Sequence, residues 1–431
     1  MDKWKASGKT SVLAVFFFLL CYFVHFGAIW KYAVNIPSMD EWEALNDNAL
    51  IAPSFRWFFA KHNEHMIAPT KLLAWLLLHL NGWNIRSSIL LSFGIFGLLV
   101  ASVVVVGRRL MFALPLWAVL AFCLFLLSTL PSENHMWGFQ SQFHFFLLFK
   151  VIAILFLFDS RQGWPAVFLG TLALAASIVS FSAGVASAAA LLAIFVLFKW
   201  HRFSKIRGWD KRELQQLVFT VTITAVVMLF WWSVPGPSVP FSYPTGMIFW
   251  RMLFRMVGWG YGLFAVSPFP VFLGFLFAGA LPLLLIWRRS EIGLTEKAMI
   301  TACIGSTLAE LSAISLGRGY FGQLFVIYRY TEVAFLLVPW SAFAWAMALE
   351  KEKIARSFVL AGLWIFFAVN FSAYLGTEAY EGIRNWRRHG VDCLESANRR
   401  GGEIRCEALY PGPLNHRLEN ARVLNISFTR R

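Results

Sequence analysis

The stretch SVLAVFFFLLCYFVHFGAIW, residues 11–30, decides the fold class because it runs through without Asp, Glu, Lys or Arg. A helix needs about 20 apolar residues to cross a hydrocarbon core of about 30 Å. The stretch follows a basic start, but it is too long for the apolar region of a signal peptide and lacks a cleavage site of small residues. We therefore expect an uncleaved membrane anchor.

Similar apolar runs recur along the whole chain. Of 431 residues, 58% are hydrophobic and 14% are charged, whereas soluble domains have about 45–50% and about 25%. These runs predict an all-α polytopic membrane protein with about eleven transmembrane helices. The expected spans are residues 11–33, 86–107, 110–130, 142–158, 164–180, 184–198, 214–232, 267–287, 295–316, 330–349 and 357–375.

Basic residues predict the orientation, because Lys and Arg near span ends stay on the cytoplasmic side. With the N-terminus inside, the basic clusters of the short loops all fall on that side. They are Lys3, Lys5 and Lys9, then Arg108 and Arg109, Arg161, Lys199 to Arg212, Arg288 and Arg289, and Lys351 to Arg356. We interpret the net charge of +15 as this topology signal, and expect no nucleic-acid partner.

An odd number of spans places the C-terminus outside. The sequence thus predicts a transmembrane module, residues 1–375, with a first outer loop at about 34–85, and an extracytoplasmic tail, residues 376–431. The tail contains Cys393 and Cys406. A disulfide between them would persist in an oxidising space, and two unpaired thiols are the alternative.

The first outer loop contains MDEWEAL, with Asp40, Glu41 and Glu43 just after the anchor. A carboxylate at this place acts as a general base if burial brings its pKa towards the working pH. The alternative is structural: Ser38 caps a surface helix whose first turn is acidic. Further along, TKLLAWLLLHL, residues 70–80, predicts a short helix along the membrane surface.

HNEH, residues 62–65, is the densest polar group of this loop. On a helix His62 and His65 share a face, and on an extended segment His62 and Glu64 do. These three residues and Asn63 could hold a sugar, a phosphate or a divalent metal. Because the spacing is not that of a zinc-binding H-E-x-x-H helix, the pattern favours a hydrogen-bonding cluster, and a divalent metal is the one cofactor left open.

Further polar residues collect on the same outer side. Arginine suits bidentate contacts to phosphate, so the arginines are candidates for a donor phosphate, and snorkelling to lipid headgroups is the alternative. The candidates for phosphate are Arg318, Arg329, Arg251 and Arg255, and those for substrate are Glu133, His135, Gln140 and Tyr330.

Two ionisable residues fall within predicted spans, Lys150 and Glu310. A charge inside a membrane is costly unless it is paired or hydrated. A Lys150–Glu310 pair is therefore a possibility that the sequence raises.

The motifs MDEW, HNEHMIAPTKL, ENHMWGFQSQF, SFSAG and GRGYFG with YRY resemble the GT-C superfamily of membrane glycosyltransferases. They are most similar to a group of polytopic bacterial inner-membrane proteins of surface-polysaccharide synthesis. The resemblance covers most of residues 1–375 and leaves the tail unexplained.

The resemblance implies a sugar donor linked to polyprenyl phosphate, a lipid or glycan acceptor hydroxyl and inversion at the sugar carbon. It also implies an active site on the outer face of the bacterial plasma membrane, with Asp40 as the base and Glu41 as a neighbour that could take the role. Two other functions remain open: a polysaccharide polymerase or ligase with a lipid-diphosphate donor, and a glycolipid transporter or flippase.

Overall fold

The computed structural model describes residues 8–46, 50, 53–111, 114–159, 163–206, 210–237, 240–263, 267–320 and 328–430. Lys3, Lys5, Arg161 and Arg207 of the predicted basic clusters lie outside these ranges. The described chain is helical and contains no β-strand, only isolated bridges.

The long helices coincide with the predicted spans. Nine helices of the described chain are long and apolar enough to cross a membrane, which confirms the all-α polytopic class. The principal helices are α1 (Gly8–Tyr32), α4 (Ile85–Leu110), α7 (Ser141–Leu157), α9 (Ala183–Ile206), α10 (Lys211–Ser233), α12 (Pro268–Phe275), α13 (Leu281–Arg288), α14 (Leu294–Arg318), α16 (Leu337–Ala348) and α17 (Lys353–Phe371).

Two predicted spans are only short helices. Span 110–130 contains α5 (Leu116–Cys123) and the 3₁₀ helix η3 (Leu124–Leu127), and span 164–180 contains α8 (Trp164–Ile178). Pro115 precedes the first helical residue of α5, and proline cannot continue a helix from the preceding segment. The described chain thus has nine long apolar helices and two shorter ones, and the count of about eleven spans stays a prediction.

Burial separates the bundle interior from a lipid-facing rim. Every residue of α16 is buried, whereas α1 leaves Phe16, Phe17 and Phe23 more than half exposed. An apolar helix with an exposed apolar surface is stable in lipid, where that surface needs no cover. Inside the bundle Lys150 Nζ lies 2.6 Å from Glu310 Oε2, with both side chains fully buried, so the suggested pair is present.

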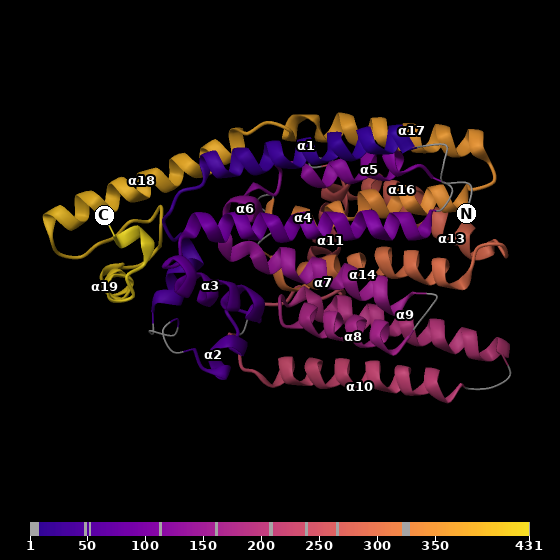
Figure 1. Ribbon diagram of the computed structural model, residues 1–431, viewed down its shortest axis with the longest axis horizontal. Coiled ribbons are helices and arrows are strands. Elements are labelled where there is room, and N and C mark those ends of the chain that lie inside the picture. The colour runs from indigo at the N-terminus through magenta and orange to yellow at the C-terminus, as the bar shows by residue number, and fades with distance from the viewer. Residues whose placement is uncertain are drawn as a thin grey trace.

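The long helix α18 and several shorter elements cover one end of the bundle. They are η2 (Met39–Leu45), α2 (Phe55–Phe59), α3 (Ala68–Asn81), α6 (Ser132–Met136), η4 (Gly138–Gln140), α18 (Glu378–Arg400), α19 (Asn415–Val423) and η8 (Ser427–Thr429). The helix α11 (Met247–Gly260) lies between candidate spans, whereas the π-helix η5 (Leu276–Ala280), η6 (Tyr328–Tyr330), α15 (Thr331–Phe335) and η7 (Ser372–Tyr374) lie within them. In Figure 1, α2, α3, α18 and α19 gather at the left, which we call the cavity end.

The opposite end, which we call the basic end, carries the last residues of α9, the first residues of α10 and the turn between α16 and α17 (Figure 1). Arg108 and Arg109 end α4 there, and Lys211 begins α10. The helix α3 exposes Leu72, Leu76 and Leu80 along one face, which fits the predicted position on a membrane surface.

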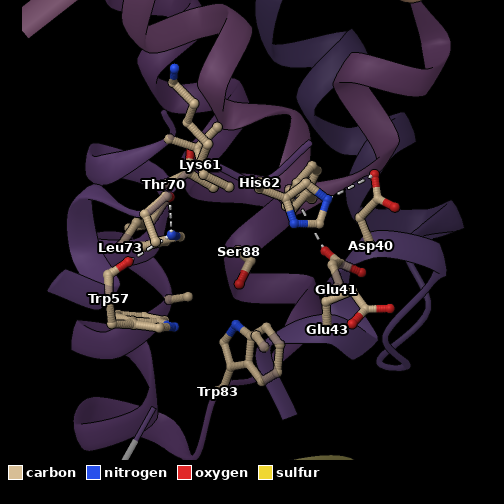
Figure 2. A pocket seen from close by; sticks show the side chains of 17 residues that line it. Asp40, Glu41, Glu43, Trp57, Lys61, His62, Thr70, Leu73, Trp83 and Ser88 are labelled. Atoms are coloured by element: carbon tan, nitrogen blue, oxygen red, sulfur yellow. Dashed lines mark hydrogen bonds and ion pairs between the residues drawn. The ribbon is translucent and has the colours of Figure 1, made fainter. Parts of the chain in front are cut away.

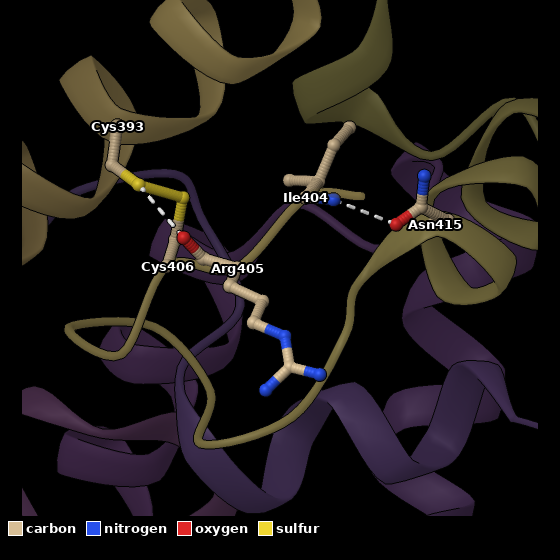
Figure 3. Close-up of a disulfide and its surroundings, with 5 residues drawn as sticks. All are labelled: Cys393, Ile404, Arg405, Cys406 and Asn415. Atoms are coloured by element: carbon tan, nitrogen blue, oxygen red, sulfur yellow. Dashed lines mark hydrogen bonds between the residues drawn. A yellow bond between two sulfur atoms is a disulfide. The ribbon is translucent and has the colours of Figure 1, made fainter. Parts of the chain in front are cut away.

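The C-terminal tail packs onto the first outer loop. Met39 N donates to Leu409 O at 2.6 Å, and Asn420 Nδ2 donates to Leu45 O at 2.7 Å. A disulfide joins Cys393 of α18 to Cys406 (Figure 3), so the disulfide rather than the unpaired alternative is present. The division at residue 375 stays a prediction, and the tail forms part of the wall of the site.

Candidate functional site

Two cavities meet at Asp40 on the cavity end. The larger cavity has a volume of about 840 Å³. Its lining is Ser38, Met39, Asp40, Asn63, Glu64, Glu133, Trp137, Pro237, Arg318, Arg329, Gly382, Ile383, Trp386 and Arg387. The structure thus gathers six of the predicted site residues, from distant parts of the chain, around one space.

The smaller cavity has a volume of about 220 Å³ and shares Asp40 with the larger one. Figure 2 shows Asp40 and His62 facing each other at one edge, with Trp57 across the space and Trp83 below. Lys71 Nζ donates to Trp57 O and Ala60 O, both at 2.7 Å, and burial lowers the pKa of Lys71 to about 8. This mixture of aromatic and polar walls is typical of small-molecule sites.

The three loop acids have different surroundings, and Asp40 is the one that faces both cavities. Its side chain is 37% exposed, and its Oδ2 lies 3.6 Å from His62 Nε2. The preceding Met39 has φ 47°, which is uncommon for a residue other than glycine. The hydrogen bond from Met39 N to the tail holds this turn and so the direction of Asp40.

Glu41 is buried, lines the smaller cavity and accepts two backbone hydrogen bonds. Its Oε2 accepts from Ser38 N at 3.0 Å, and its Oε1 accepts from Phe139 N at 3.2 Å. The first contact is half of a capping box for η2, as in the structural alternative of the sequence analysis. Burial raises the pKa of Glu41 to about 7, against the lowering effects of Arg387 and the two N–H groups.

Glu43 is held by the tail. Arg417 Nη2 donates to Glu43 Oε1 at 3.2 Å, and the Tyr410 hydroxyl also donates to Glu43. Of the three acids, only Asp40 lines both cavities without accepting a backbone or tail hydrogen bond within the described chain.

HNEH forms a tight turn, so neither the helical nor the extended arrangement is present. His62 N donates to His65 O at 2.8 Å, and His65 N returns the bond at 3.0 Å. Asn63 has φ 51°, a conformation that asparagine tolerates better than most residues. The turn directs the side chains to separate partners, His62 towards Asp40 and Glu64 to Arg318.

His65 lies behind the larger cavity. Its Nδ1 is 2.6 Å from Ser182 Oγ, in the SFSAG motif. Burial, with added repulsion from Arg318 and Arg329, lowers the pKa of His65 well below its ordinary range. The neutral form of His65 is therefore favoured, and its Nε2 lies 3.3 Å from Glu64 Oε1 in the same turn.

Three guanidinium groups reach the larger cavity. Arg318, at the end of α14, pairs with Glu64 and donates from Nε to the Tyr330 hydroxyl at 2.9 Å. Arg329 lies beside the Tyr330 ring and has no carboxylate partner in the described part of the chain. Arg387 of α18 is 3% exposed, and its buried Nη1 has no hydrogen-bond partner.

Sequence reasoning missed Arg387, because the tail was left without a function. The letters RNWRRHG, residues 384–390, show a basic stretch, but nothing in them tells which arginine turns inward. Only the packing of α18 over the first loop makes that choice.

Other predicted residues lie away from the cavities. Arg251 and Arg255 are exposed on α11 and line neither cavity, because the amphipathic helix turns its apolar face inward. His135, Gln140 and Tyr330 are buried and line neither cavity, and their contact with substrate stays a prediction.

No family model matches the chain, and no curated protein does. Among solved structures the chain is similar to ArnT from Cupriavidus metallidurans in the apo state, with 13% identity, a TM-score of 0.48, and coverage of 97% of this chain and 77% of that one. It is also similar to the same protein bound to undecaprenyl phosphate, with 14% identity, a TM-score of 0.47 and the same coverage.

Proposed function

We propose that the protein is a membrane glycosyltransferase that moves a sugar from a polyprenyl-phosphate donor to a hydroxyl group of a lipid- or glycan-linked acceptor. One observation supports this most: Asp40 lies where two cavities meet, and the larger cavity carries Arg318, Arg329 and Arg387. A base is thus placed between an anion-binding space and a second, partly aromatic space.

The guanidinium groups fit the donor phosphate. As the bond between the sugar carbon and the phosphate oxygen breaks, negative charge grows on that oxygen. Fixed positive groups around it stabilise the transition state more than the ground state. Arg329, without a carboxylate partner in the described chain, is the first candidate for direct contact, and Arg318 is held for it by Glu64 and Tyr330.

Asp40 fits the role of general base. The acceptor hydroxyl gives its proton to the Asp40 carboxylate while its oxygen forms the new bond to the sugar carbon, on the side opposite the departing phosphate. This geometry inverts the carbon, and proton transfer of this kind contributes about 10²–10⁴-fold to a rate. His62, 3.6 Å from Asp40, orients the carboxylate.

The smaller cavity is the proposed acceptor site. Trp57 and Trp83 supply flat apolar surfaces, and Thr70 and Ser88 supply hydroxyl groups around the same space. An acceptor sugar has apolar faces and polar edges, so both kinds of wall are used. Because Asp40 belongs to both cavities, an acceptor there reaches the base without a movement of the backbone.

We further propose that the cavity end faces the outside of a bacterial plasma membrane. Basic residues at the other end favour the cytoplasm, and the disulfide at the cavity end persists in an oxidising space. The product would belong to a cell-surface glycan.

The test is a transfer assay on the purified full-length protein in detergent with a panel of polyprenyl-phosphate sugars and a lipid acceptor extract. We expect a new glycosidic product by mass spectrometry and a loss of about 10²–10⁴-fold in Asp40→Asn. The matched control is Glu352→Gln, an acid at the basic end. Full activity of Asp40→Asn, a need for a lipid-diphosphate donor, or movement of glycolipid between leaflets without product would overturn the proposal.

A further inference from the structure

A second cluster of ligand-type side chains lies behind the larger cavity. His135 of α6, His144 of α7 and Glu332 of α15 place one nitrogen or oxygen each within 4.8 Å of one another. Both histidines are fully buried, and Glu332 is 3% exposed. None of the three lines either cavity, so the cluster is separate from the proposed catalytic site.

The far side of each ligand is held by a neighbouring group. His135 Nδ1 is 2.9 Å from the Tyr380 hydroxyl, and His144 Nδ1 is 2.8 Å from Ser92 Oγ. Glu332 Oε2 accepts from Asn134 Nδ2. Histidines that bind metals use their second nitrogen in this way, which fixes the tautomer and the ring direction.

The inward atoms are the ones left over. His135 Nε2, His144 Nε2 and Glu332 Oε1 are buried and have no hydrogen-bond partner. Buried polar atoms without partners are costly and uncommon. Three such atoms around one point are explained together by one cation.

An ion pair is the competing explanation, since His144 Nε2 lies 3.1 Å from Glu332 Oε1. That pair would leave His135 Nε2 without a partner. The distance is also close to the separation of about 3.3 Å between two ligand atoms of a tetrahedral zinc ion, each bound at about 2.0–2.1 Å. Two imidazoles and a carboxylate suit zinc.

We propose that His135, His144 and Glu332 bind a zinc ion that joins α6, α7 and α15. Its effect on the larger cavity is indirect. Asn134 Nδ2 bonds both Glu332 and the Arg329 carbonyl, the latter at 2.9 Å. The zinc thereby holds the segment that carries Arg329. The proposal is independent of the glycosyltransferase assignment, because its test needs no substrate.

The first measurement is metal content. Full-length protein carrying an affinity tag without histidine is exposed to zinc and then freed of excess metal. We expect elemental mass spectrometry to find about one zinc per chain. We also expect a chelator to lower the melting temperature. His144→Ala and Glu332→Gln should lose the metal, whereas the exposed controls His79→Ala and His201→Ala should keep it.

The second measurement looks for a new spectroscopic signal, so it does not depend on the loss of metal from a disruptive variant. His135→Cys keeps a zinc-type ligand, so the cobalt-loaded variant should show a thiolate-to-cobalt charge-transfer band that wild type and His79→Cys lack. If the wild type binds no metal and the chelator leaves its melting temperature unchanged, the cluster is a His144–Glu332 ion pair. Metal bound without the band in His135→Cys would place it elsewhere, and either result overturns the proposal.

Discussion

The two ends of the bundle use the same charged residue types in different ways. At the basic end, Arg289 Nη2 pairs with Glu352 Oε1 at 2.6 Å, and the Glu352 side chain is 48% exposed. Lys351 pairs with Glu291 on the surface. At the cavity end, the Arg318 and Glu64 side chains are each 18% exposed beside a cavity of about 840 Å³.

The difference in exposure between these ion pairs affects how strongly their charges act. An exposed ion pair contributes about 0–1 kcal/mol, because water and salt screen it. The same charges act more strongly where water is excluded. We therefore relate the net charge of +15 to topology, and the few arginines that converge on a cavity to the proposed chemistry.

The largest effect expected from this comparison is on activity. Arg318→Gln should lower kcat by about 10²–10³-fold, as does the loss of one fixed donor at a developing anion. The measurement is the transfer assay, with Arg289→Gln from the basic end as the matched control. Equal activity of the two variants would break the comparison between the ends.

The buried pair between the two ends tests stability. Lys150→Met should lower the free energy of unfolding by about 3–5 kcal/mol, because it leaves Glu310 charged and alone in the interior. The double variant Lys150→Met with Glu310→Leu should recover most of this loss. Thermal unfolding in detergent measures both, and a double variant as unstable as the single one would contradict the explanation.

Glu41, at the cavity end, should make the stability of the protein depend on pH. Its pKa in the folded protein, about 7, lies above the ordinary 4.5, so the folded state binds the proton more tightly. Its contribution to stability is complete below about pH 4.5 and is lost as the pH rises to about 7, a change of about 3 kcal/mol. Glu41→Gln should make the melting temperature depend less on pH between these values. If the pH dependence is unchanged in this variant, other groups cause it.

The smallest effect belongs to the basic end. Arg289→Gln should change the free energy of unfolding by about 1 kcal/mol or less, with a smaller difference at high salt. Melting curves at two salt concentrations measure it. A loss as large as that of Lys150→Met would show that the pair is not a simple surface contact.

Much of the fold could be predicted from the sequence. The run at residues 11–30 became α1, and residues 70–80 became α3. A Lys150–Glu310 pair could be suggested from the sequence because a charge in a span is costly without a partner, and the structure contains it. The turn at HNEH could not, since two backbone bonds and the positive φ of Asn63 depend on packing around it.

The site was predicted in part. Asp40, Glu64, Arg318 and Arg329 do meet at one cavity, because all follow spans that end on the same side. Arg387 was missed, and so was the cluster around His144, whose ligand atoms come from three separate elements. Arg251 and Arg255 were predicted on the same ground, as arginines on the outer side, but they are exposed and line neither cavity.

The sequence by itself determined the membrane class and the end at which polar groups gather, because a bilayer imposes these on apolar runs and on basic loops. The tertiary structure alone decided which acid faces both cavities, which arginines converge and which histidines share a point. These choices depend on side-chain directions across helices far apart in the chain, and local residue patterns carry no information about such distances.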